Sequence, residues 1–402
     1  MNRLRTEIEK HVDRKNVREL LARLLQTPSY WTPLMEKEPM VLNFIKEVVF
    51  RELRDVGLKD ITVDRTGNLI ARIKTKKNGP RVLYVAYAMT GESGTMKEPF
   101  SGKILDGRSL GLKGEFIWGR GANEQKGSLG AMITALKVLT ELGVEPCGEV
   151  TLVVSTAGET GTHDSLRQVI EVDGVRADRA IVSGEYDKIQ IANKGRLDII
   201  ITVKGRGTHT RTPWEGVDAI QGMFAVYEKV KPLIPYPNKN THQFLGRATL
   251  IPMGLESFPR DSHTVQEKCI LTLDRRLLPG EDPKSAFPQI ADTVGSVEPY
   301  EVSVESGPYL LPSEVSPDAT VVRDLMASIR TVGAAVPELE YSHAAYDAGY
   351  LNHKGIETVR YGAGNHYFPA SYGHSDRDVV SVEETIDVAK ALAAMALKGV
   401  DL

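Results

Sequence analysis

Four side chains that can bind a metal or transfer protons follow segments typical of buried strands or of strand–helix turns. They are Glu124, Glu159, Glu185 and His374. Open α/β sheets bind ligands at the carboxyl ends of their strands, so we expect these side chains to meet at one sheet edge. Carboxylates gathered in this way repel one another unless they hold a cation or share protons. The pattern therefore indicates a metal site or an acid–base cluster, and a set of helix caps and solvated residues is the alternative.

The elements that must position these residues alternate between strand and helix. A nearly continuous apolar run at 82–89 predicts a strand buried on both faces, and 151–155 and 180–184 predict two more. A helix is expected from Gly127, and the segment 90–121 before it has no clear periodicity, which predicts a long loop. This order favours an α/β fold with a mixed sheet.

The middle of the chain follows a different pattern. Residues 196–205 alternate apolar and polar side chains, as a half-exposed strand does, and further β and helical segments follow them. From about Leu311 the chain returns to helix–strand–helix order. We therefore predict one α/β domain in two sequence pieces, 1–194 and 311–402, and an inserted α+β domain over 195–310.

Composition limits the classes of function. The 402 residues carry 50 Lys and Arg against 53 Asp and Glu, which gives a net charge of −3. A charge so close to zero argues against binding to nucleic acid or to an anionic membrane. No apolar stretch approaches the roughly 20 residues of a membrane helix, and two cysteines cannot form a disulfide framework. We predict a cytoplasmic globular protein that binds neither nucleic acid nor a membrane.

Four motifs occur in an order that is specific to one family. They are PFSGKILDG, WGRGANEQKG, LTLDRRLLPGED and the terminal Gly-Ala-Gly…Gly-His stretch. With them the chain resembles the acetylornithine deacetylase, succinyl-diaminopimelate desuccinylase and glutamate carboxypeptidase family of two-zinc amidohydrolases, over nearly its full length. The resemblance implies that the split α/β domain is the catalytic one, that the insert is a lid, and that the lid forms a homodimer.

The chain departs from the family at the metal positions. The family's His-x-Asp pair is matched by Tyr87 and Met89, and its Glu-Glu pair is matched by Gly158-Glu159, so the usual general base has no side chain here. The bridging aspartate is replaced by Glu124. The resemblance then implies one divalent metal, with zinc as the first choice, on Glu124, Glu159 and His374, or no metal at all.

Other matching positions concern the substrate. Glu185 matches a ligand position and could act as the base, and Tyr87 could donate a proton in a metal-free site. The resemblance assigns His209 to oxyanion stabilisation in a neighbouring subunit and Arg276 to a substrate carboxylate, although Arg276 could simply pair with Asp274.

Three further positions match substrate-contacting family positions. His263 falls where relatives carry an asparagine, and Gly362 and Gly364 match a loop whose amides approach the substrate. The strand at 196–205 is a candidate dimer edge.

Three functions remain open at this stage. The first is a one-metal amidohydrolase acting on an amide or C–N bond of an amino-acid-derived carboxylate. The second is a metal-free acid–base enzyme, an isomerase, lyase or cyclase, on an amino-acid-like substrate. The third is a non-catalytic dimer that binds a metabolite or a protein.

Overall fold

The structure is a computed structural model of the chain. It describes residues 3–32, 34, 37–157, 161–364, 367–368 and 376–400, apart from the side chain of Glu124. Glu159 and His374 therefore lie outside the described residues.

Contacts between residues divide the chain into two compact units. The first unit contains residues 1–191, 315–340 and 351–402, and the second contains residues 192–314 and 341–350. The second unit therefore contains the insert and, in addition, the short segment 341–350, which we call the return segment.

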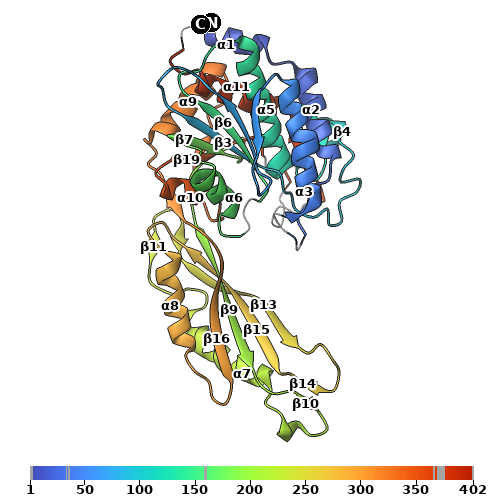
Figure 1. Cartoon of the computed structure of the whole chain (residues 1–402), viewed down its shortest axis with the longest axis vertical. Helices are drawn as coiled ribbons and strands as arrows, with labels where there is room; N and C mark the ends of the chain where they lie inside the picture. Colours follow the sequence, from blue (N-terminus) through green and yellow to red (C-terminus); the bar gives the residue numbers. More distant parts are fainter. Residues whose placement is uncertain are drawn as a thin grey trace. The chain divides into compact units, whose positions relative to one another are not determined.

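The first unit is built on a mixed sheet (Figure 1). Its strands pair in the order β1-β2-β6-β3-β7-β19-β8-β17, and β18 also pairs with β8. The strands of this sheet are β1 Asp60–Val63, β2 Leu69–Ile73, β3 Val82–Tyr87, β6 Val150–Ser155, β7 Arg179–Val182, β8 Lys188–Asn193, β17 Ser313–Glu314, β18 Glu338–Ser342 and β19 Glu357–Arg360.

The centre of this sheet is parallel. Strand β3 runs parallel to β6 and to β7, and β19 runs parallel to β7. Every residue of β3 and β6 is buried, because the sheet is covered on both faces and its central strands are apolar. The predicted α/β fold with a mixed sheet is confirmed.

Helices of the first unit pack on one another and on the sheet. Helix α11 contacts α2, α5 and α9, α5 contacts β3, and α9 contacts β19. The Tyr84 hydroxyl on β3 donates a 2.7 Å hydrogen bond to the Leu392 carbonyl of α11. The α-helices are α1 Arg3–Lys10, α2 Arg14–Gln26, α3 Pro39–Asn43, α4 Phe50–Asp55, α5 Gly127–Leu142, α6 Asp164–Arg167, α9 Thr320–Val332, α10 Ala348–His353 and α11 Val382–Ala396, of which α10 begins in the return segment.

The segment 90–121, predicted as a long loop, is partly regular. It contains β4 Lys103–Asp106 and β5 Glu115–Trp118, and β5 also pairs with β20 Val379–Ser381 near the end of the chain. The prediction was wrong because these strands are too short to show periodicity.

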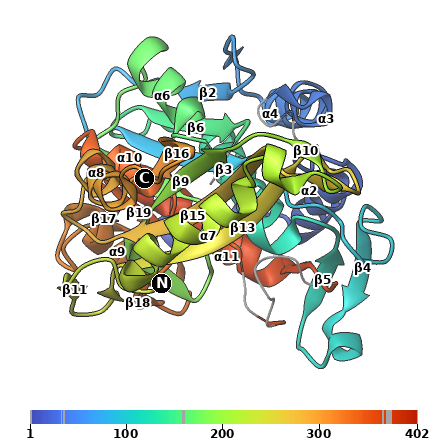
Figure 2. The ribbon, with the colours of Figure 1, turned by 90° about the horizontal axis from the view of Figure 1, so that it is seen from below.

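The second unit is a four-stranded sheet with two helices on one face. The sheet order is β13-β15-β9-β16, and all its neighbouring strands are antiparallel. Figure 2 shows α7 lying along β15. The long elements are β9 Gly195–Lys204, β13 Thr249–Phe258, β15 Lys268–Leu277, β16 Glu301–Leu310, α7 Ala219–Val230 and α8 Pro283–Val294, and the short strands are β10 Thr208–His209, β11 Thr241–His242, β12 Gly246–Arg247 and β14 Thr264–Val265.

Strand β9 is central in that sheet and not an edge. It pairs over its length with β15 on one side and β16 on the other. The expectation that residues 196–205 form a dimer edge is therefore wrong. Its alternation arises because one face packs on α7 and α8 while the other face is uncovered.

The return segment 341–350 packs within the second unit. The Lys194 amide donates to the Ser342 carbonyl at 3.1 Å, and the rings of Phe244 and Tyr341 stack with centroids 4.2 Å apart. No helix among the residues described is long and apolar enough to cross a membrane.

Candidate active site

The carboxyl ends of the parallel strands bring several predicted residues to one sheet edge. Tyr87 is the last residue of β3 and pairs in register with Ser155, the last residue of β6. The Ser183 amide, two residues before Glu185, donates to the Val85 carbonyl of β3 at 2.9 Å. Glu159 follows Ser155 by four residues in the sequence. Tyr87, Ser155 and the segment that leads to Glu185 therefore lie at one sheet edge of the first unit.

The Gly362–Gly364 loop lies against the segment that carries Glu185. Gly364 forms a parallel bridge with Glu185, and the Gly364 amide donates to the Gly184 carbonyl at 3.0 Å. The Gly362 amide donates to the Glu185 carbonyl at 3.2 Å. Both amides expected to face a substrate are thus already hydrogen-bonded inside the protein, so a substrate contact here would have to use other atoms.

Close packing explains why these two positions are glycine. A Cβ added to Gly362 would lie 2.1 Å from the Ser128 hydroxyl, and one added to Gly364 would lie 2.8 Å from the Asn123 carbonyl oxygen. Asn123 is the neighbour of Glu124 in sequence. The glycine loop therefore connects the backbone around Glu124 with the strand end that carries Glu185.

The side-chain amide of Gln190 helps to orient the Glu185 carboxylate. Gln190 Nε2 donates to Glu185 Oε1 at 3.1 Å and to Glu340 Oε2 at 2.6 Å. The Gln190 oxygen accepts from Arg360 Nη1 at 2.8 Å, which sets the orientation of the amide. An orientation fixed in this way suits a group that accepts a proton at a defined position.

Asp378 holds the turn on which Glu124 stands. Its carboxylate accepts from the amides of Gly121 and Asn123 at 2.7 and 2.8 Å, and it pairs with Arg120 Nη1 at 3.3 Å. Both charged side chains are almost fully buried. This carboxylate therefore anchors the turn that carries Glu124, and Asp378 itself is four residues after His374 in sequence. Asp378 was not predicted to have a role, because an acidic residue in a loop carries no distinctive sequence pattern.

Lys126, in the same turn, is a buried ammonium. Its Nζ donates to the carbonyls of Leu24 and Thr27 at 3.0 and 2.5 Å and lies 4.3 Å from the centre of the Phe44 ring. Burial lowers the pKa of Lys126 to about 7, and the nearby Asp378 carboxylate opposes that shift. These hydrogen bonds therefore connect the turn to the C-terminal end of α2.

The described residues show which of the family's metal positions carry a side chain that can bind a metal. Of the described family metal positions, Tyr87, Met89 and Glu185, only Glu185 carries a carboxylate or an imidazole. No group of three His, Cys, Asp or Glu side chains close enough to hold a metal occurs in the described part of the chain. A second metal of the family type therefore does not fit Tyr87 and Met89. The set Glu124, Glu159 and His374 has donor chemistry suited to one zinc.

Two predicted histidines lie together in the second unit. The rings of His209 and His263 stack with centroids 6.2 Å apart, because β10 pairs with β14 beside them. The Arg211 amide donates to His209 Nδ1 at 3.0 Å, which places the proton of a neutral ring on Nε2. His209 can therefore offer an N–H donor to an oxyanion.

Arg276 lies at the other end of the lid sheet. It pairs in register with Arg196 at the start of β9, whereas His209 follows the end of β9 at Lys204. Eight strand residues separate these ends by about 27 Å, so one copy of the lid does not bring Arg276 and His209 together. Arg276 also binds Asp274 through Nε and Nη2 at 2.9 Å each, which is the alternative considered from the sequence.

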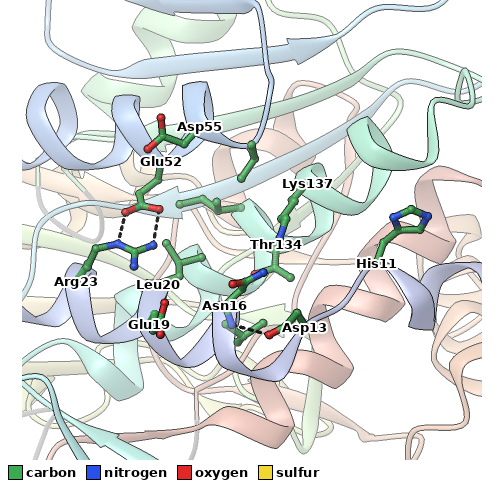
Figure 3. A pocket seen from close by; sticks show the side chains of 13 residues that line it. His11, Asp13, Asn16, Glu19, Leu20, Arg23, Glu52, Asp55, Thr134 and Lys137 are labelled. Atoms are coloured by element: carbon green, nitrogen blue, oxygen red, sulfur yellow. Dashed lines mark hydrogen bonds and ion pairs between the residues drawn. The ribbon is translucent and has the colours of Figure 1, made fainter.

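A separate cavity of about 220 Å³ lies among α2, α4 and α5 (Figure 3). Its lining includes Leu20 and Thr134, and also Arg23 and Glu52, which form an ion pair with two hydrogen bonds. None of the predicted site residues lines it. The cavity is therefore distinct from the sheet edge described above.

Comparison with known proteins agrees with the architecture. The sequence model of peptidase family M20/M25/M40 matches residues 89–398. The protein YgeY of Escherichia coli K12 is 29% identical over 262 residues, 63% of this chain and 60% of that protein, so the match spans about three fifths of that relative. A succinyl-diaminopimelate desuccinylase of Nitrosomonas eutropha is 23% identical over 340 residues, 77% of this chain and 86% of the enzyme.

Solved structures share the fold across nearly the whole chain. An M20 family metallo-carboxypeptidase of Sulfolobus solfataricus superposes with a TM-score of 0.74 at 18% identity, covering 94% of this chain and 98% of that chain. A Bacillus subtilis protein described as a dinuclear metal-binding M20 peptidase superposes with a TM-score of 0.64 at 13% identity, covering 96% and 98%.

Proposed function

The chain belongs to peptidase family M20/M25/M40, and from that membership we propose that it hydrolyses an amide or C–N bond of an amino-acid-derived carboxylate with one metal. The observation that carries the proposal is the shared sheet edge, where Tyr87, Glu185 and the backbone around Glu124 meet. Glu124, Glu159 and His374 would hold the metal. A zinc ion bound there supplies carbonyl polarisation and a bound water of lowered pKa.

The protein's own residues then divide the remaining work. Glu185, oriented by Gln190, accepts the proton of the attacking water and passes it to the leaving nitrogen. Tyr87 lies at the strand end where relatives have an imidazole, and its buried ring helps to exclude water from this edge. Arg276 binds the substrate carboxylate through Nη1, while its Nη2 binds Asp274.

The lid units form a homodimer in this proposal. Arg276 lies at one end of the lid sheet and His209 follows the other end, about 27 Å away, so His209 would serve the site of the other copy. Strand β13 is one of the two edges of the lid sheet, and its Ile251, Met253 and Leu255 are 43, 52 and 56% exposed. Apolar side chains on an open edge favour pairing with a second copy. The predicted cytoplasmic location belongs to the same proposal.

Metal content and turnover test the site together. We expect about one zinc per chain by plasma mass spectrometry of protein purified without affinity-tag metals. Glu159→Ala should lose that metal. Glu185→Gln should keep the metal and lower turnover of N-acyl amino acids by about 10² to 10⁴-fold. Glu340→Gln, which changes the other carboxylate on Gln190, is the matched control and should retain activity.

Other outcomes would reject parts of the proposal. Two tightly bound metals would reject the one-metal site, and full activity after exhaustive chelation would reject metal-assisted hydrolysis in favour of acid–base chemistry. For the dimer, Met253→Arg should shift sedimentation from dimer to monomer, whereas Arg260→Gln in the neighbouring loop should leave it unchanged. A wild-type monomer would reject the dimer.

A further inference from the structure

Tyr361 points to the face of the first unit's sheet on which α11 packs. The Tyr84 hydroxyl of β3 bonds to α11, so the Tyr84 side chain lies on that face. Tyr84 pairs in register with Ile181 on β7, and Ile181 pairs in register with Val359 on β19. Side chains of neighbours in register point to the same face, and side chains alternate along a strand. Tyr361 is two residues after Val359 and continues the pairing, because its amide donates to the Val182 carbonyl at 3.0 Å.

Two acidic side chains of α11 meet tyrosine hydroxyls on this face. Glu384 and Asp387 are three residues apart, so they lie on the same side of the helix. The Tyr186 hydroxyl donates to Asp387 Oδ2 at 3.1 Å, and the Tyr367 hydroxyl donates to Glu384 Oε1. Asp187, next to Tyr186, adds a third carboxylate. We use the name tyrosine–acid cluster for Tyr186, Asp187, Tyr361, Tyr367, Glu384 and Asp387.

Two buried oxygen atoms of the tyrosine–acid cluster have no hydrogen-bond partner among the described residues. They are the hydroxyl of Tyr361, which is 0% exposed, and Oε2 of Glu384. Burial first, and further causes that include the carboxylates of Asp387 and Glu384, raise the pKa of Tyr361. The Tyr361 hydroxyl therefore faces these carboxylates. Because a buried polar atom without a partner is costly, the two oxygens indicate a ligand that the described residues do not supply.

The usual role of a glutamate near a helix start does not explain Glu384. Ser381 is the N-cap of α11, and its hydroxyl accepts from the Glu384 amide at 3.3 Å. A glutamate three residues after such a serine commonly bonds back to the N-cap amide. The Glu384 carboxylate instead accepts from the Tyr367 hydroxyl through one oxygen and leaves the other without a hydrogen bond in the described part of the chain.

The negative charge of the cluster is not balanced by a basic side chain. On the same helix, Glu383 pairs with Arg14. No Lys, Arg or His side chain in the described ranges forms an ion pair with Glu384, Asp387 or Asp187. Burial first raises the pKa of Glu384 to about 7, and the Asp187 and Asp387 carboxylates act in the same direction. A carboxylate in such surroundings is neutralised either by a proton or by a bound cation.

The two oxygens suit a monovalent cation better than a divalent one. Oxygen atoms are the ligands that hard cations prefer. Divalent ions commonly take several carboxylates, and no group of three His, Cys, Asp or Glu side chains close enough to hold a metal occurs in the described part of the chain. The two oxygens belong to one carboxylate and one neutral hydroxyl, so they offer a single negative charge.

We propose that Glu384 Oε2 and the Tyr361 hydroxyl bind an alkali cation, Na⁺ or K⁺, between α11 and the end of β19. Tyr361 directly precedes Gly362, and Tyr186 directly follows Glu185. The Gly362 amide donates to the Glu185 carbonyl at 3.2 Å. The ion therefore joins α11 to the two segments that meet beside Glu185. This site goes beyond the proposed hydrolase function and can be measured without turnover.

Thermal unfolding of the full chain at pH 8 tests the site. Sodium or potassium chloride replaces tetramethylammonium chloride at constant ionic strength, which removes the general screening effect of salt. Tetramethylammonium is the reference because it is too large to lie between two buried oxygens. An ion that binds only the folded state stabilises it by mass action, so at least one of the two ions should give a saturable rise in Tm of about 2 °C or more.

Two variants connect the rise in Tm with the site. Glu384→Gln removes the charge and keeps the shape of the side chain, so it should abolish the rise. Tyr361→Phe removes the hydroxyl and keeps the ring, so it should increase the half-saturating salt concentration about fivefold. Glu383→Gln removes a charge from the same helix, but from the pair with Arg14, and this matched control should keep the wild-type rise.

A measurement on the wild type covers the case in which a variant fails to fold. Diffraction from wild-type crystals grown in rubidium chloride should show an anomalous peak between Glu384 and Tyr361. No rise in Tm with either ion, a rise that Glu384→Gln retains, or no peak at this position would overturn the proposal. A larger saturable rise with calcium chloride that also depends on Glu384 would overturn the monovalent class.

Discussion

The two units hold an aspartate–arginine pair in different ways. In the first unit, Asp378 is bound by two main-chain amides as well as by Arg120, and both side chains are almost fully buried. In the second unit, Asp274 is bound by Arg276 alone among the described side chains, and Arg276 is 31% exposed. The pair in the first unit therefore fixes the backbone of a turn, whereas the pair in the second unit leaves the Arg276 guanidinium accessible to a ligand.

The largest expected effect comes from breaking the buried pair. Asp378→Ala should lower the free energy of unfolding by about 3 to 5 kcal/mol, because it leaves the Arg120 charge buried without its partner. Asp274→Ala should cost about 1 kcal/mol, since solvent reaches Arg276. Urea unfolding of the two variants measures the difference. Equal losses of unfolding free energy would show that the two main-chain hydrogen bonds to Asp378 add no stability to the first unit.

The next effect compares crowded with open glycines. Gly362→Ala should cost about 1 to 3 kcal/mol by overpacking against Ser128 and Gly184. Gly254→Ala in β13 should change stability by less than about 0.5 kcal/mol, because no atom lies within 4 Å of the added Cβ. Thermal unfolding distinguishes them. A neutral Gly362→Ala would mean that the glycine loop can move away from its neighbours.

A smaller effect concerns a half-buried acid on α11. Burial raises the pKa of Glu384 to about 7, against the opposing hydrogen bond that the Tyr367 hydroxyl donates. The folded state then binds more protons than the unfolded state between pH 4.5 and 7, so this group's contribution to stability falls as pH rises through that window.

Glu384→Gln removes this dependence. The variant should be about 1 to 2 kcal/mol more stable than the wild type at pH 8 and equal to it near pH 4.5. Urea unfolding at the two pH values checks the result. A difference that does not change with pH would contradict the raised pKa.

The smallest effect is expected at the surface of the lid. Lys204 and Glu301 form an exposed 2.6 Å ion pair. Lys204→Ala should change the free energy of unfolding by less than about 0.5 kcal/mol, and added salt should make even that difference vanish. A loss above 1 kcal/mol would show that exposed lid pairs act more strongly than solvent screening allows.

More of the fold than of the candidate site could be predicted from the sequence. Apolar runs such as 82–89 predict buried strands because both faces of the sheet are covered, and the order of strands then places Tyr87 and Glu185 at one edge. The short strands between 90 and 121 and the central position of β9 were not predictable, because alternation shows which face is buried but not which strands are neighbours.

Contacts that depend on distant residues were also missed. Asp378 binds amides 255 and 257 residues earlier, and Arg196 faces Arg276 across two strands. Neither relation leaves a local pattern. The roles of Glu124, Glu159 and His374 stay predictions from the family resemblance.

The return segment 341–350 affects how a lid can be exchanged between two members of the family. Because this segment packs with residues 192–314, the lid is not a single insertion that could be cut out at one pair of sites. A chimaera that receives only residues 192–314 from a relative would keep the recipient's own Tyr341, which would then pack against the donor's residue at the Phe244 position. Recombination between family members would therefore tend to preserve lids whose two pieces descend together.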